Sequence, residues 1–131
     1  MNKEHIDQAI QEKKVFALQG TNLEAVKSAE LKLNFKFPKE YVEFLISYGA
    51  MSIKDHEIFG IAPSTHIDVL SNTLEERERY NVLSPYIVVE NLAFDGLLIT
   101  MDEKGLIYEF NNESFEKISD SFEQYIHQLI G

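Results

Sequence analysis

The chain contains no cysteine, which rules out a disulfide framework, a thiolate zinc site and a cysteine nucleophile. It has no apolar run close to the roughly 20 residues that a membrane-spanning helix needs. Its polar N-terminal stretch, residues 1–14, lacks the apolar segment of a secretory signal. These absences predict a cytoplasmic protein without a membrane partner.

Basic residues are also scarce, because twelve lysines and arginines stand against 22 acids and give a formal net charge of −10. Residues 1–54 hold eight lysines and seven acids, whereas residues 55–131 hold four bases and fifteen acids. A surface that grips phosphates is basic, so this balance argues against direct nucleic-acid binding. The acidic second half would attract a basic partner, but it serves solubility as readily.

The length and the 44% hydrophobic content predict one domain over residues 1–131 with a packed core. Apolar residues at steps of three and four predict two early helices, the second capped by Thr21 with Glu24. The best-defined helix begins with Pro38 at its first position and ends before Gly49. Its aromatic stripe is expected to face the core; the stripe comprises Tyr41, Phe44, Leu45 and Tyr48.

The second half of the chain is dominated by predicted strands. These cover residues 57–61, 86–90, 96–101 and 106–110. A helical region is predicted over 64–80 in two pieces, the second capped by Asn72 or Thr73. A final helix is predicted to be capped by Ser121 with Gln124. Short connections favour antiparallel pairing, so we expect an α+β fold with a largely antiparallel sheet of about four to six strands flanked by helices.

No residue pattern indicates catalysis, a cofactor or a metal site. His5, His56, His66 and His127 lack zinc-type spacing, and nucleophile elbows, phosphate loops and dinucleotide fingerprints are all missing from the sequence. Adjacent acids such as Glu75 and Glu76 are expected to be solvated. An enzyme acting on small substrates would require a pocket with convergent polar groups.

Two segments are candidates for partner contact. The charged run from Glu75 to Arg79 reads as a solvated helix face that also offers acids to a partner's lysines and arginines. The loop from Asn91 to Gly96 carries Phe94 beside an acid, a composition found at interface hot spots, although Phe94 packing on the core is equally compatible.

From Glu30 to Gly60 the chain runs through a helix end, a Phe-Pro junction, an aromatic helix, a glycine stop and a short strand closed by glycine. With Ser121-Phe122-Glu123-Gln124-Tyr125, this order resembles the SUKH superfamily, named after the fungal cell-wall-assembly regulators and including many bacterial immunity proteins. The resemblance spans about residue 21 to the end of the chain. Members often read Asn-Gly-Gly where this chain has Tyr48-Gly49-Ala50.

The resemblance implies a non-catalytic binding domain, and in bacteria an immunity protein that neutralises a polymorphic toxin, often a nuclease. A nuclease is basic where it grips phosphate, so an acidic inhibitor fits that surface. We therefore expect a cognate toxin as partner and a binding face made of acids from the second half: Glu75, Glu76, Glu78, Glu90 and Asp95. The alternative is a regulatory scaffold of the cell-wall type that binds cellular proteins.

Overall fold

The computed structural model describes residues 1–93 and 96–131, which form five α-helices, two 3₁₀ turns and seven strands. Their order along the chain is α1 (Lys3–Gln11), β1 (Val15–Ala17), α2 (Leu23–Leu33), α3 (Lys39–Tyr48), β2 (Met51–Ile53), β3 (His56–Ile58), η1 (Thr65–Ile67), α4 (Val69–Arg79), η2 (Asn81–Leu83), β4 (Ile87–Leu92), β5 (Leu97–Met101), β6 (Ile107–Phe110), β7 (Phe115–Ser119) and α5 (Phe122–Ile130).

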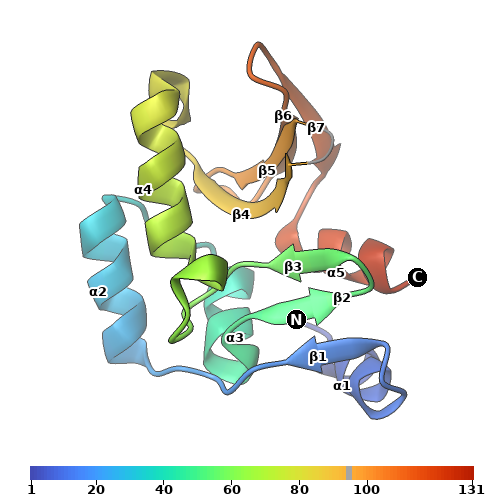
Figure 1. Cartoon of the computed structure of the whole chain (residues 1–131). Coiled ribbons are helices and arrows are strands. Elements are labelled where there is room, and N and C mark those ends of the chain that lie inside the picture. The colour runs from blue at the N-terminus through green and yellow to red at the C-terminus, as the bar shows by residue number, and fades with distance from the viewer. Residues whose placement is uncertain (94–95) are drawn as a thin grey trace.

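The strands form two antiparallel sheets, ordered β1-β2-β3 and β4-β5-β6-β7 (Figure 1). The sheets approach each other where the Phe59 amide donates a hydrogen bond of 2.8 Å to the Val89 carbonyl. The predicted α+β class and antiparallel pairing are confirmed. The strands are divided between two sheets because the chain leaves β3 through η1 and α4 before it returns as β4.

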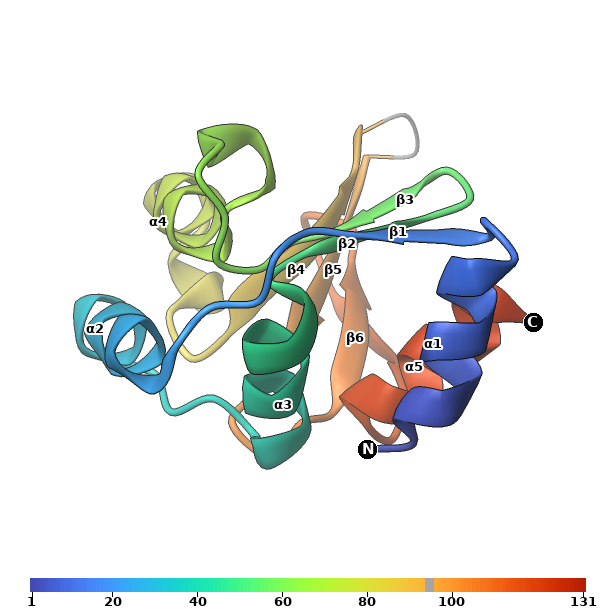
Figure 2. The same cartoon turned by 90° about the horizontal axis from the view of Figure 1, so that it is seen from below.

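The helices pack in two groups around the sheets. Helix α2 lies against α4 on one flank, and α1 lies against α5 at the other end of the molecule (Figure 2). Helix α3 contacts both α2 and α5 and so lies between the two groups. The N- and C-terminal helices are therefore neighbours, although they are the first and last elements of the chain.

The aromatic stripe of α3 is part of the core, as predicted. Tyr41 and Phe44 are fully buried, and each packs edge-on against Phe122 of α5 with ring centroids 5.0 Å apart. Burying an aromatic side chain of this kind is worth about 1.5–3 kcal/mol. The Tyr41 hydroxyl donates to the Phe59 carbonyl at 2.6 Å, which connects the helix to the end of β3.

The two glycines in the Glu30–Gly60 signature allow two backbone segments to touch. Gly49 follows α3 with φ +73° and accepts a hydrogen bond of 3.0 Å from the Ile61 amide. A Cβ added at Gly60 would lie 1.7 Å from the Gly49 carbonyl oxygen, so only glycine fits there.

Several helix starts differ from those predicted. Asn22 caps α2 by accepting from the Ala25 amide at 2.9 Å, so the proposed Thr21 cap is wrong. Helix α4 begins at Val69 because Asp68 accepts from the Ser71 amide at 3.0 Å, one turn before the predicted start. Thr73 instead accepts from the Val88 amide at 2.9 Å and joins α4 to β4. The predicted Ser121 cap is confirmed, since its side chain accepts from the Gln124 amide.

Candidate partner-binding face

Two open hollows meet at Asn91 and Ala93, between α4, the β3 hairpin and the end of β4. We call the two hollows together the acidic groove. Their volumes are about 190 and 270 Å³. Neither is large, so the groove suits side chains of a protein partner better than a drug-sized ligand, whose pockets run from about 300 Å³ upward.

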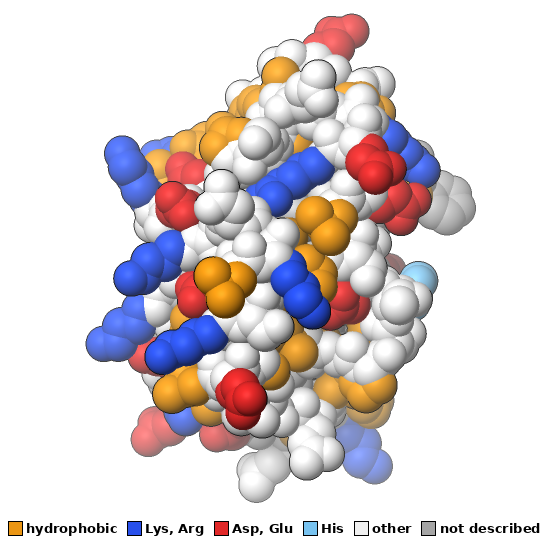
Figure 3. Space-filling model, turned by 90° about the vertical axis from the view of Figure 1, so that its left-hand side faces the viewer, with side chains coloured by type: hydrophobic (Ala, Val, Ile, Leu, Met, Phe, Trp, Pro, Cys, Tyr) orange, Lys and Arg blue, Asp and Glu red, His pale blue; other side chains and the backbone are white. Residues whose placement is uncertain are grey.

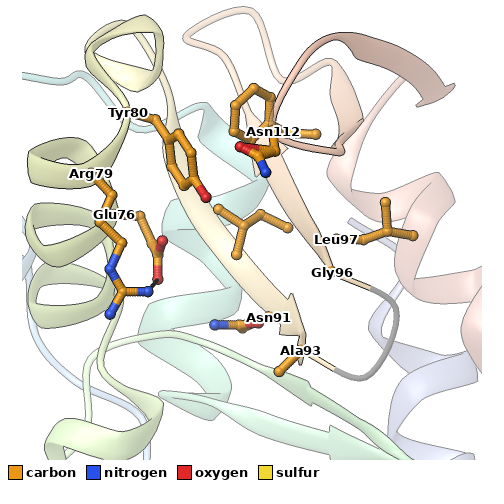
Figure 4. Close-up of a pocket in the computed structure, with 10 residues that line it drawn as sticks. Glu76, Arg79, Tyr80, Asn91, Ala93, Gly96, Leu97 and Asn112 are labelled. Carbon is orange, nitrogen blue, oxygen red and sulfur yellow. Dashed lines mark ion pairs between the residues drawn. The ribbon is translucent and has the colours of Figure 1, made fainter.

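The smaller hollow lies between α4 and the second sheet. Figure 4 shows Glu76 and Arg79 on its helical side, facing Asn91 and Ala93 across the space, with Tyr80 near one end. Arg79 joins two acids, at 3.2 Å to Glu75 and 3.5 Å to Glu76. The exposed pair with Glu75 contributes less than about 1 kcal/mol, so a partner can separate it at little cost.

Glu76 is the buried acid of this helix, with 6% of its surface exposed. Burial raises the pKa of its carboxyl and the neighbouring Glu75 adds to the rise, while Arg79 opposes it. Ionised Glu76 therefore lowers the stability of the folded protein, and Arg79 offsets part of this effect. The burial of Glu76 does not follow from its place on a helix, since Glu75 on the same helix is exposed.

The larger hollow is bordered by Asp55 and Glu57 of the β2–β3 hairpin and by His66 of η1. Both acids are exposed, and Glu57 lies 3.1 Å from the His66 ring nitrogen. Asn72 at the start of α4 is fixed by donating to the Asp68 carbonyl at 2.8 Å. This part of the groove thus adds two solvent-facing acids that the sequence analysis did not select.

Glu90 forms the floor of the larger hollow and is only 1% exposed. One carboxylate oxygen accepts a hydrogen bond from the Tyr125 hydroxyl of α5, and the other is bonded to the ring of His56 on β3. Burial and the Glu90 charge raise the pKa of Tyr125 well above its usual range. Both Glu90 oxygens therefore bind internal groups that join β3, β4 and α5.

The five acids selected from the sequence thus fall into three groups. Glu75 and Glu78 are exposed on α4, one turn apart. Glu76 and Glu90 are buried, and Asp95 lies outside the described residues, as does Phe94. The structure brings Glu76 and Glu90 to the same groove but turns Glu90 inward, because β4 carries it beneath the hairpin. Partner binding by the five acids stays a prediction.

Arg77, a basic residue near the acids of α4, binds backbone carbonyls and not these acids. Arg77 donates at 2.7 Å to the Leu33 carbonyl and at 2.8 and 3.2 Å to the Tyr86 carbonyl. It therefore ties the end of α2 to the start of β4 and forms no ion pair among the described residues. The lysines of α2 lie on the same flank as α4, where Figure 3 shows basic side chains interspersed with acidic and hydrophobic ones. The exposed acids of α4 thus face solvent with Arg79 as their close basic neighbour.

Comparison with known families gives one match. The family model SUKH_5, described as SMI1-KNR4 cell-wall, matches residues 2–130. The chain belongs to this family. No curated protein matches it. The resemblance drawn from Glu30–Gly60 and the Ser121–Tyr125 segment is thereby confirmed and extended to the N-terminal helix.

Other contacts in this SUKH family member had no signal in the sequence. His56 meets Glu90 at a sequence separation of 34, and the ring nitrogens of His5 and His127 lie 2.6 Å apart, joining α1 to α5. Each pair depends on tertiary packing between distant elements, which residue spacing does not reveal. An alignment of homologous sequences in which the two positions of each pair vary together would indicate these contacts.

Two further observations bear on what the protein contacts. Across residues 1–93 and 96–131, no group of three or more histidines and acids is gathered as a metal ion would require. In the same part of the chain, none of the helices combines the length and apolarity needed to cross a membrane.

Proposed function

We propose that this protein is a non-catalytic immunity protein of the cytoplasm that binds and neutralises a cognate toxin, a basic nuclease. The family allows this role, and the charge distribution supports it. A nuclease inhibited in this way presents lysines and arginines arranged for phosphate, and an acidic surface occupies them by the same attraction.

The observation that carries the proposal is the pair of exposed acids on α4. Glu75 and Glu78 project from one rigid helix beside the acidic groove. Asp55 and Glu57 border the same groove from the hairpin. Arg77 is held by backbone carbonyls, so Arg79 is the arginine of α4 that forms ion pairs with these acids, and its exposed pair with Glu75 is weak. We infer a binding face made of these four exposed acids.

The groove supplies the shape that accompanies this charge. Asn91 and Ala93 lie at the point where its two hollows meet, and each hollow admits a side chain of a partner. Long basic side chains suit such hollows, since an arginine packs its stem on apolar walls and places its guanidinium on carboxylates. Within this proposal, Glu76 and Glu90 shape the face and Glu75 and Glu78 meet the partner.

Under this proposal a neighbouring gene encodes the toxin. The experiment is co-expression of this chain with a basic toxin domain encoded beside it, followed by purification through a tag on the toxin. A stoichiometric complex that loses nuclease activity is the expected result. Separate elution of the two chains at physiological salt, with nuclease activity unchanged, would contradict the proposal.

The second candidate is a regulatory scaffold, favoured by the family description, which names the cell wall. Such a scaffold binds cellular proteins and has no toxin partner. Crosslinking in the native cell separates the two candidates, because the scaffold would be joined to proteins of cell-wall synthesis. The immunity protein would be joined to a nuclease.

A further inference from the structure

The outer edge of β1 carries backbone groups that point to solvent. The Leu18 amide donates to the Ala50 carbonyl at 3.0 Å, and Phe16 is paired with Ser52 in the same register. In an antiparallel ladder, bonded residues alternate with residues whose amide and carbonyl point away from the partner strand. Val15 and Ala17 therefore turn their backbone groups outward, to the side opposite β2.

This edge is uncovered. Strand β1 ends the first sheet, and in Figure 2 it is the strand nearest the viewer, with α1 to one side of it. Beside the edge, Phe16 is 66% exposed and Leu18 is 44% exposed. An edge strand of this kind accepts an added strand from another chain.

The surroundings of β1 are basic, unlike the protein as a whole. Lys13, Lys14 and Lys54 line an open concave surface of about 510 Å³ together with Phe16 and Ser52. Lys14 forms an exposed ion pair of 3.3 Å with Glu12. Among the residues that the structure describes, Lys13 and Lys54 have no ion-pair partner.

We infer that the β1 edge is a docking site for an extended acidic segment of a partner protein, which adds to the first sheet as a further strand. The backbone of Val15 and Ala17 supplies hydrogen bonds, Phe16 supplies an apolar contact, and the three lysines select acidic side chains. A second copy of this chain is a poor occupant, because it would bring the same lysines to the edge and be repelled.

The docking site and the acidic groove meet at the turn between β2 and β3, where Lys54 lines the first and Asp55 borders the second. The β1 edge and α4 lie at different ends of the molecule in both views of the fold (Figures 1 and 2). The α2 flank also carries lysines, but its backbone groups are bonded within the helix. The inference rests on the β1 edge and its lysines, so it does not depend on the proposed function.

The first test uses a capped, fluorescent peptide of about six residues that alternates glutamate and valine, a length typical of a strand. Its binding to the full chain is followed by fluorescence anisotropy at low salt. Lys13 and Lys54 both have positive φ, which asparagine tolerates, so the variant Lys13→Asn with Lys54→Asn keeps the fold. The matched control, Lys27→Gln with Lys32→Gln, removes two exposed charges from α2.

We expect saturable binding that weakens about five- to tenfold in the β1 variant and less than about twofold in the control. A peptide alternating lysine and valine can bind the acidic groove, so its binding should not weaken in the β1 variant. Absence of binding by the acidic peptide, equal loss in both variants, or equal weakening of the acidic and the lysine peptide in the β1 variant would overturn the inference.

The second test is amide hydrogen exchange of the full chain by NMR. Strand addition predicts that exchange of the Val15 and Ala17 amides slows at least about tenfold when the acidic peptide saturates the protein. The Phe16 amide, which faces β2, serves as the internal control and should change little. Binding that leaves the Val15 and Ala17 amides unprotected would show a purely electrostatic contact and overturn strand addition.

Discussion

The Tyr125 hydroxyl donates a hydrogen bond to the Glu90 carboxylate in the interior of the protein, joining α5 to β4. The same carboxylate is bonded to His56 of β3. Glu90 therefore connects the two sheets with the last helix. This assigns a structural role to an acid that the sequence places among the candidates for partner contact.

Glu90→Ala is expected to lower the free energy of unfolding by about 2–4 kcal/mol, because it leaves the Tyr125 hydroxyl and His56 without their partner. Tyr125→Phe should cost about 1–2 kcal/mol. Denaturant unfolding followed by circular dichroism measures both. Tyr80→Phe is the control, since the Tyr80 hydroxyl has no hydrogen bond in the described part of the chain, and it should change stability by less than about 0.5 kcal/mol. Full stability of Glu90→Ala would contradict the structural role.

Stability is expected to fall in alkaline solution. Burial raises the pKa of Tyr41 and Tyr125 well above the usual range, so the folded protein keeps both protons while the unfolded chain loses them above about pH 10. The protonated tyrosines make their full contribution to the free energy of unfolding below that pH. This contribution is lost as the pH rises, by up to about 1.4 kcal/mol per pH unit for each tyrosine.

The test is denaturant unfolding between about pH 9 and 11. The Tyr125→Phe variant should lose stability less steeply with pH than the unmodified chain, because one of the linked tyrosine protons is absent. Tyr80→Phe should follow the unmodified chain. Parallel curves for all three proteins would show that the Tyr125 proton is not linked to folding.

Glu76→Gln is expected to stabilise the protein at neutral pH. Because the pKa of Glu76 is raised in the folded protein, its protonated carboxyl contributes to folding stability. This contribution is present below about pH 4, where the glutamate of the unfolded chain is protonated, and it is lost as the carboxyl ionises in the folded protein. Removing the charge should raise the free energy of unfolding at pH 7 by on the order of 1 kcal/mol and have no effect near pH 3. The exposed neighbour variant Glu75→Gln should be neutral at both values. Destabilisation by Glu76→Gln at pH 7 would show that its pair with Arg79 outweighs its burial.

Gly60→Ala is expected to cost more than about 3 kcal/mol, because the new methyl group meets the Gly49 carbonyl oxygen at 1.7 Å and the backbone must move. Gly96→Ala is the matched control. Gly96 has φ +65° but open space around its Cβ position, so only the conformational cost of about 1–2 kcal/mol applies. Thermal unfolding compares the two variants, and equal losses would contradict the close approach of the two backbone segments.

The sequence predicts those parts of the fold that have a strong local pattern. The cap at Ser121 is found as predicted, and the aromatic helix is found with its start at Lys39, one residue after the predicted first position at Pro38. Strands β1 and β2 are only three residues long, too short to show alternation, and their pairing links residues more than thirty positions apart. Tertiary contacts fix these strands, so local residue patterns do not reveal them.

The candidate face was predictable in part. Charge density points to α4, and the structure exposes Glu75 and Glu78 there. The inward orientation of Glu90 follows from a bulge at Val88–Glu90 and from its contact with α5, neither of which has a sequence signature. Asp55 and Glu57 were missed because they join the face only when the hairpin folds beside β4.

The central claim is that exposed acids on α4 bind a basic partner. Its most direct measurement is calorimetric titration of the basic toxin domain encoded beside this chain into the variant Glu75→Lys with Glu78→Lys. The matched control, Glu113→Lys with Glu116→Lys, makes the same charge change at exposed positions of the β6–β7 hairpin. We expect at least about tenfold weaker binding in the α4 variant at low salt and less than about twofold in the control. Unchanged affinity of the α4 variant, or equal weakening of both, would contradict the account.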